Sequence, residues 1–114
     1  MPHCIIEHSN DVLTRVTQQQ LIDSVLTGAK KSALFELDHI KLRTHAYEYY
    51  QKGDVKQAGF IHVTVRILQG RTVEQRQDLS EKVLQEFDHL RLSAVTITVE
   101  IVEMETASYT KKVI

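Results

Sequence analysis

The sequence predicts a small α+β fold, in which two βαβ units form one four-stranded sheet with two helices on one face. Three observations support this prediction. Two segments open with a helix-capping pattern. The residues after each capping pattern include apolar residues at helical spacing. Each of these segments is followed by one in which apolar and polar residues alternate, as in a strand. The order strand, helix, strand therefore occurs twice along the chain.

The first unit begins at the N-terminus. Residues 4–7 form a short apolar stretch typical of a strand, followed by a polar turn at residues 9–11. Thr17 with Gln20 three residues later fits a capping box, and the apolar residues after it recur at helical spacing: Leu21, Ile22, Val25, Leu26 and Ala29. Residues 40–47 then alternate as a strand with one buried face, before a turn around residues 52–54.

The second unit repeats this order. Residues 61–67 alternate as a strand that ends at Gly70, and Thr72 with Gln75 fits another capping box. The predicted helix carries one apolar stripe, made of Leu79, Val83, Phe87 and Leu90. Residues 95–101 alternate as the last strand. We therefore expect one domain over residues 1–114, made of two repeats at about 2–55 and 58–104 with a C-terminal tail.

Composition limits the classes of function. Lys and Arg total 14 against 15 Asp and Glu, a net charge of −1, so no basic field attracts nucleic acid or anionic lipid. No apolar run approaches the roughly 18 residues that span a bilayer, and the N-terminus lacks the pattern of a secretory signal. We expect a cytoplasmic protein that binds neither nucleic acid nor membranes.

Cysteine and histidine give no sign of a metal centre. The single cysteine, Cys4, has no CxxC partner, and its setting in a strand favours a small buried residue over a nucleophile. Six histidines form no HxH or HExxH array. His45 and His62 either support a pocket or serve as hydrogen-bonded structural residues, and Tyr47, Tyr49 and Tyr50 either shape a hydrophobic mouth or pack. No metal and no cofactor are predicted.

Several short motifs resemble known isomerases. The initiator Met1 with Pro2 at the head of a strand resembles the tautomerase superfamily. Residues 61–76, with their strand, Gly70-Arg71 and helix start, resemble the beginning of a 4-oxalocrotonate tautomerase subunit. The whole chain resembles the 5-carboxymethyl-2-hydroxymuconate isomerase family, on its doubled length and on four segments: Pro2-His3, Arg43-Thr44-His45, Phe60-Ile61-His62 and Gly70-Arg71.

This resemblance implies a tautomerase fold that assembles as a homotrimer and acts on an unsaturated dicarboxylate in aromatic-compound catabolism. It implies an isomerase that converts a 2-hydroxymuconate-type acid to its 2-oxo isomer without a cofactor. Pro2 is then the catalytic residue that carries the proton, and Arg71 is both catalytic and substrate-binding. Arg43 is the second candidate for binding a substrate carboxylate, and its alternative is a cross-strand salt bridge or subunit contact.

The residue types suit this chemistry. Moving a proton between oxygen and carbon needs one group that accepts and returns a proton near neutral pH. Once Met1 is removed, Pro2 offers a secondary amine, and burial with nearby positive charge lowers the pKa of such an amine. In the second unit the aligned residue is Ile61, whose nitrogen is an amide, so only one half of the chain can be catalytic. Arg71 precedes a predicted helix N-terminus, which also favours anions.

Two other interpretations remain open at this level. One is a non-catalytic oligomeric domain with a ferredoxin-like fold, in which Pro2 only begins an edge strand. The other is a degenerate tautomerase fold without turnover. Both interpretations share with the isomerase an uncovered sheet face and open strand edges, which call for partners.

Overall fold

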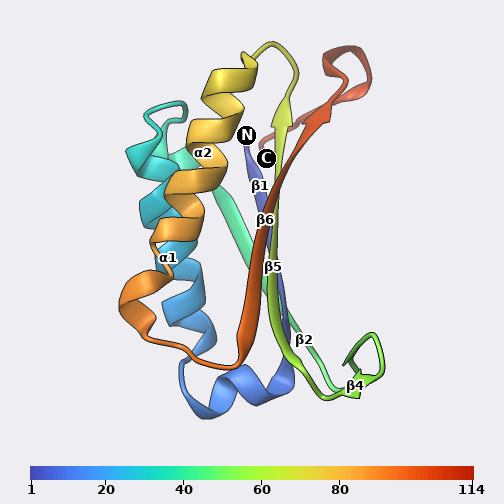
Figure 1. Ribbon diagram of the computed structural model, residues 1–114. Coiled ribbons are helices and arrows are strands. Elements are labelled where there is room, and N and C mark those ends of the chain that lie inside the picture. The colour runs from blue at the N-terminus through green and yellow to red at the C-terminus, as the bar shows by residue number, and fades with distance from the viewer.

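The structure is a computed structural model that describes all 114 residues, and it contains the two predicted βαβ units in one sheet (Figure 1). The first unit consists of β1 (His3–Ser9), α1 (Gln18–Lys31) and β2 (Lys41–Tyr47). The second consists of β5 (Gly59–Leu68), α2 (Val73–Gln85) and β6 (Val95–Met104). Two short strands, β3 (Gln51–Lys52) and β4 (Val55–Lys56), form a hairpin between the units.

The strand order of the main sheet is β2-β1-β5-β6. Strands pair in parallel within each unit, and β1 and β5 pair antiparallel between the units. A ferredoxin-like split βαβ unit has another strand between its two strands. Here the two strands of each unit are direct neighbours, so the ferredoxin-like alternative is wrong.

The antiparallel pairing of β1 and β5 decides where the candidate site lies. His3 pairs with Arg66, so the beginning of β1 lies beside the end of β5. Pro2 immediately precedes β1, and Gly70-Arg71 follows β5 after one further residue. Residues about seventy positions apart in sequence are therefore brought to the same end of the sheet.

Both helices begin with the predicted capping boxes. The Thr17 hydroxyl accepts a hydrogen bond from the Gln20 amide at 3.1 Å, and the Gln20 side chain accepts one from the Thr17 amide at 2.9 Å. Thr72 and Gln75 form the same reciprocal pair with the same distances, 3.1 and 2.9 Å. Each box satisfies two backbone donors that a helix N-terminus otherwise leaves unpaired.

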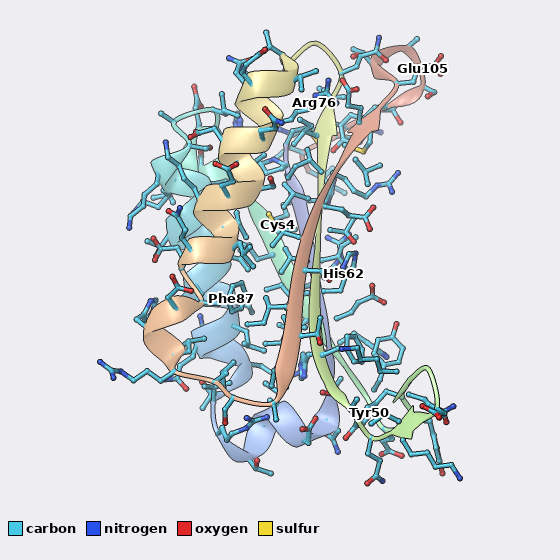
Figure 2. The ribbon with its side chains drawn as sticks, viewed as in Figure 1. Cys4, Tyr50, His62, Arg76, Phe87 and Glu105 are labelled. Atoms are coloured by element: carbon cyan, nitrogen blue, oxygen red, sulfur yellow. The ribbon has the colours of Figure 1, made fainter.

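Both helices cover the same face of the sheet (Figure 1), and the hydrophobic core lies between the helices and the sheet. Figure 2 shows Cys4 and Phe87 in this layer, whereas His62 points away from the helices. The helices approach closely at Gly28, where an added Cβ atom would lie 2.6 Å from the Val83 Cα atom. A glycine is therefore required for this helix–helix distance.

The predicted periodicities are confirmed with one difference at the end of α2. Phe87 is buried as the apolar stripe predicts, yet α2 ends at Gln85 and a 3-10 turn at Asp88–Leu90 follows. An apolar stripe reports burial, and it does not distinguish an α-helix from the tighter turn that continues it. None of the helices has the length and apolar character that a membrane crossing requires.

Candidate active site

Pro2 lies at the head of β1 and its side chain is fully buried. Its carbonyl oxygen accepts a hydrogen bond from the Lys41 amide at 3.0 Å, which joins the first residue before β1 to the first residue of β2. Proline has no N–H to donate to a ladder, and at the start of a strand no such donor is required. The position therefore combines a fixed backbone with an apolar environment.

A cavity of about 440 Å³ opens at this end of the sheet. Its lining includes Met1, whose carbonyl carbon is bonded to the nitrogen of Pro2. It also includes the segment after α1 and the segment between β5 and α2, through Leu34, Phe35, His39, Gly70 and Arg71. The cavity thus lies where the two βαβ units meet, and the residue that covers the Pro2 nitrogen forms part of its wall.

Arg71 is held in this cavity by the segment that follows α1. Its Nη2 atom donates to the main-chain carbonyl oxygen of Leu34 at 2.8 Å, and its guanidinium carbon lies 6.0 Å from the centroid of the Phe35 ring. Gly70 has a φ of 118°, a conformation that side-chain-bearing residues rarely adopt, and it turns the chain directly before Arg71. Arg71 forms no ion pair, so its remaining N–H groups are available to an anion.

The chain terminus lies in a positively charged environment. The Met1 amine donates to the His39 carbonyl oxygen at 3.2 Å, and the Lys41 ammonium donates to the same oxygen at 3.3 Å. Partial burial, followed by the positive charges of Lys41 and Lys111, holds the pKa of the Met1 amine below its usual value of 8.0. Burial and these two ammonium groups therefore disfavour a protonated nitrogen at this place in the fold.

Arg43 lies at the same end of the sheet but outside the Arg71 cavity. Its side chain belongs to the sheet face that the helices leave open, where its Nη1 atom lies 3.3 Å from Nδ1 of His3. The predicted alternative, a cross-strand salt bridge, is not formed, because no carboxylate lies within 4.0 Å of this guanidinium. Burial and the positive charge of Arg43 lower the pKa of His3 from 6.5.

Sequence reasoning missed two of the cations near the terminus. Lys41 was predicted only as an exposed strand residue, although strand alternation places it on the same face as Arg43. Lys111 lies in the C-terminal tail, where no periodicity indicates a position. The sequence shows a net charge of −1 for the whole chain, and this sum conceals a local gathering of positive charge.

The aromatic and histidine residues considered in the sequence lie elsewhere. Tyr47 and Tyr50 line a second cavity of about 560 Å³ with Phe60, at the opposite end of the sheet from Pro2. Within one chain, these tyrosines therefore do not line the cavity beside Pro2. His62 is held by Thr98 at 2.7 Å and Glu100 at 2.6 Å, as expected of a structural residue.

Of the remaining polar groups, Glu36 and His39 also line the cavity, whereas Cys4 does not. Cys4 is buried beneath the helices, and burial raises the pKa of its thiol to about 12, which removes it as a nucleophile. One group of three possible metal-ligating side chains occurs, on the turn before β2, with all ligand atoms within 4.8 Å: Glu36, Asp38 and His39. The Nε2 atom of His39 lies 3.7 Å from a carboxylate oxygen of Glu36 and 4.0 Å from one of Asp38.

Comparison with known proteins found one matching family model and several solved structures of similar fold. The family model described as 5-carboxymethyl-2-hydroxymuconate isomerase matches residues 2–113. No curated protein sequence matches the chain significantly.

Solved structures share the fold at low sequence identity. A structure described as Pt0534 inactivated by 2-oxo-3-pentynoate is 14% identical with a TM-score of 0.79, over 96% of this chain and 90% of that chain. A 5-carboxymethyl-2-hydroxymuconate isomerase from Deinococcus radiodurans R1 is 20% identical with a TM-score of 0.72, over 97% and 88%. A symmetric trimer of wild-type W0 fused 4-OT is 15% identical with a TM-score of 0.73, over 90% and 87%.

Proposed function

Because the chain belongs to the 5-carboxymethyl-2-hydroxymuconate isomerase family, we propose that it converts a 2-hydroxymuconate-type dicarboxylic acid to its 2-oxo isomer. The proton is carried by the amine of Pro2, which becomes free when Met1 is removed. The reaction uses no cofactor, since it transfers a proton within the substrate and changes no net oxidation state. The substrate class places the enzyme in the breakdown of aromatic compounds.

One observation carries the proposal: Met1, whose carbonyl carbon blocks the Pro2 nitrogen, lines the same cavity as Arg71. Removing Met1 has two consequences at this place. It converts an amide nitrogen, which cannot act as a base, into a secondary amine, and it enlarges the cavity beside a guanidinium. The freed amine then faces a space that already contains a group able to bind a carboxylate.

The proposed proton transfer balances without any further reactant. The Pro2 amine accepts the proton of the substrate's 2-hydroxyl group, and the O–H electron pair forms the 2-oxo group as the conjugated double bonds shift. The resulting prolinium ion returns a proton to a carbon of the conjugated chain. Arg71 stabilises the negative charge of the dienolate. A guanidinium that is already held in place is effective here, because it need not reorganise as that charge develops.

The charges around the terminus support a base that acts near neutral pH. Lys41 and Lys111 lower the pKa of the Met1 amine, and after removal of Met1 the same ammonium groups act on the Pro2 amine. Full burial of the Pro2 side chain adds to this effect. The same cations attract a substrate with two carboxylates.

Arg43 serves as the second carboxylate ligand, and the protein assembles as a homotrimer in this proposal. Arg43 has no carboxylate partner and lies on the open face of the sheet, so it can act in its own site or in that of a neighbouring copy. The similarity to fused 4-OT trimers supports the assembly. A sedimentation measurement at micromolar concentration tests it, and a monomer contradicts it.

The test of the function begins with the intact mass of the purified protein, which separates Met-free from Met-retaining molecules. Ketonisation of a 2-hydroxymuconate is then measured for both forms and for Pro2→Ala. We expect activity in the Met-free protein and a loss of at least about 100-fold in the Met-retaining form. Equal rates in both forms, or no turnover by fully trimmed protein, contradict the proposal and favour a fold without catalysis.

A further inference from the structure

The C-terminal tail returns to the start of the chain. Figure 1 shows the two termini beside one another at one end of the sheet. After β6 a short 3-10 turn at Thr106–Ser108 leads to Tyr109, whose hydroxyl group lies 3.0 Å from Nε2 of His3. The two rings meet edge to face, with centroids 6.1 Å apart and an angle of 67° between their planes.

His3 links this tyrosine to Arg43. A guanidinium can only donate, so Nδ1 of His3 accepts from Nη1 of Arg43 across 3.3 Å. The proton of the neutral imidazole is then on Nε2, which donates to the Tyr109 hydroxyl oxygen at 3.0 Å. Both ring nitrogens are therefore engaged, and the ring cannot rotate without breaking both hydrogen bonds.

Arg43 depends on this ring for its orientation. Its side chain is exposed, no carboxylate pairs with it, and its hydrogen bond to His3 is the one side-chain contact that fixes the guanidinium. A single neutral partner leaves several N–H donors unused. The arrangement resembles a prepared anion-binding group more than a structural ion pair, because an unpaired arginine gains its missing partner only from outside the chain.

We propose that Tyr109 is a positioning residue, which fixes the ring of His3 so that Arg43 is oriented to bind a substrate carboxylate. This inference rests on the function proposed above. The C-terminal tail then contributes two groups to the active site. Tyr109 acts through His3, and Lys111, two residues further on, places a positive charge near the terminal nitrogen.

The kinetic test uses Tyr109→Phe, which keeps the ring and removes the hydroxyl group. Losing one positioning hydrogen bond of about 1 kcal/mol corresponds to roughly a fivefold increase in KM, with kcat changed less than about twofold. The effect disappears when Arg43→Ala is already present, because the hydroxyl acts through that guanidinium. Tyr49→Phe is the matched control, since Tyr49 is 92% exposed and lies outside the network. An unchanged KM in Tyr109→Phe overturns the proposal.

Two further measurements do not require turnover. Nitrogen chemical shifts of His3 report its tautomer, which we expect to be Nε2-protonated in the parent protein and mixed in Tyr109→Phe. Binding of muconate, an unreactive dicarboxylate, should weaken about fivefold in Tyr109→Phe and remain unchanged in Tyr49→Phe. If trimmed protein shows no turnover but muconate binding weakens as expected, the proposed reaction fails and the positioning role stands. Equal muconate affinity in both variants overturns the role.

Discussion

Arg71 and Leu34 are joined by a 2.8 Å hydrogen bond between the Arg71 guanidinium and the Leu34 carbonyl oxygen, across 37 positions of sequence. This contact connects the segment after α1 to the turn before α2, so it ties the two βαβ units together at the edge of the cavity. The orientation of the guanidinium is therefore set before a ligand arrives, which reduces the entropy that binding costs.

Replacing Arg71 tests this preorganised orientation. Arg71→Ala should lower kcat/KM for the ketonisation about 100-fold, because it removes both a bidentate carboxylate ligand and a cation near the dienolate. The kcat/KM of Arg71→Lys should lie between those of the parent protein and Arg71→Ala, since lysine keeps the charge and loses the planar fork. Arg91→Lys, at an exposed turn outside the cavity, is the control. Steady-state kinetics that fail to separate Arg71→Ala from this control would remove Arg71 from the mechanism.

The pH dependence of Met-free enzyme should report the charge of Lys41. The amine must be unprotonated to accept a proton, so kcat/KM rises with pH and levels off above the pKa of the amine. Burial and the charges of Lys41 and Lys111 lower the pKa of the terminal amine, so the plateau begins at a lower pH. Lys41→Met removes one of these charges, which raises the pKa and moves the rising limb to higher pH.

Lys56→Met is the matched control for this pH profile, because Lys56 is exposed in the β3–β4 hairpin. The hairpin lies at the opposite end of the sheet from Pro2, and its charge is screened from the amine by solvent. The two profiles are measured at the same ionic strength. Equal shifts in both variants, or no shift in Lys41→Met, would show that Lys41 does not tune the base.

Gly28 should resist a substitution that usually stabilises helices. Glycine to alanine inside a helix normally gains about 1 kcal/mol. Here the new Cβ atom would lie 2.6 Å from the Val83 Cα atom and 2.8 Å from the Lys82 carbonyl oxygen, both of them backbone atoms that cannot turn aside. We expect Gly28→Ala to lower the free energy of unfolding by about 2 kcal/mol, measured by denaturant titration at equal protein concentration.

Thr27→Ala is the neighbouring control for Gly28→Ala. Thr27 is exposed on the same helix, and its hydroxyl donates only to the Asp23 carbonyl oxygen one turn earlier. Alanine at this position should be neutral or stabilising by up to about 0.7 kcal/mol, since helix propensity is the dominant effect there. A Gly28→Ala protein as stable as Thr27→Ala would mean that the helices can separate without cost.

Cys4 should be unreactive in the folded protein. It is fully buried, and burial raises the pKa of its thiol to about 12, so almost no thiolate is present at neutral pH. We expect no labelling by a thiol reagent at pH 7.5 in the native state, and one labelled thiol per chain in denaturant. Rapid labelling of native protein would show that the sheet opens at β1.

Most of the fold was predictable from local pattern. The capping pairs Thr17–Gln20 and Thr72–Gln75 were confirmed because the partners of a capping box are three residues apart and need no tertiary contact. The buried strand residues Ile61, Val63 and Val65 were confirmed because side chains alternate across a strand. The end of α2 was less predictable, since a single apolar stripe continues through both Phe87 and the turn after it.

The candidate site was only partly predictable. Pro2 and Arg71 were singled out from sequence, and the structure places the residue bonded to Pro2 in the Arg71 cavity. Lys41 and Lys111 were missed, because their effect on the terminal nitrogen depends on positions across the sheet and along the tail. The tyrosines had two interpretations from sequence, a hydrophobic mouth or packing, and the direction of β2 carries Tyr47 to the end of the sheet opposite Pro2.

By itself, the sequence determined the elements, their order and the face that each buries, because propensity, capping and side-chain alternation act over a few residues. Only the tertiary structure decided which distant groups meet. The antiparallel pairing of β1 with β5 sets Pro2 beside Gly70-Arg71, and the returning tail sets Tyr109 against His3. Pairing register and chain reversal follow from packing of the whole core, which no local pattern encodes.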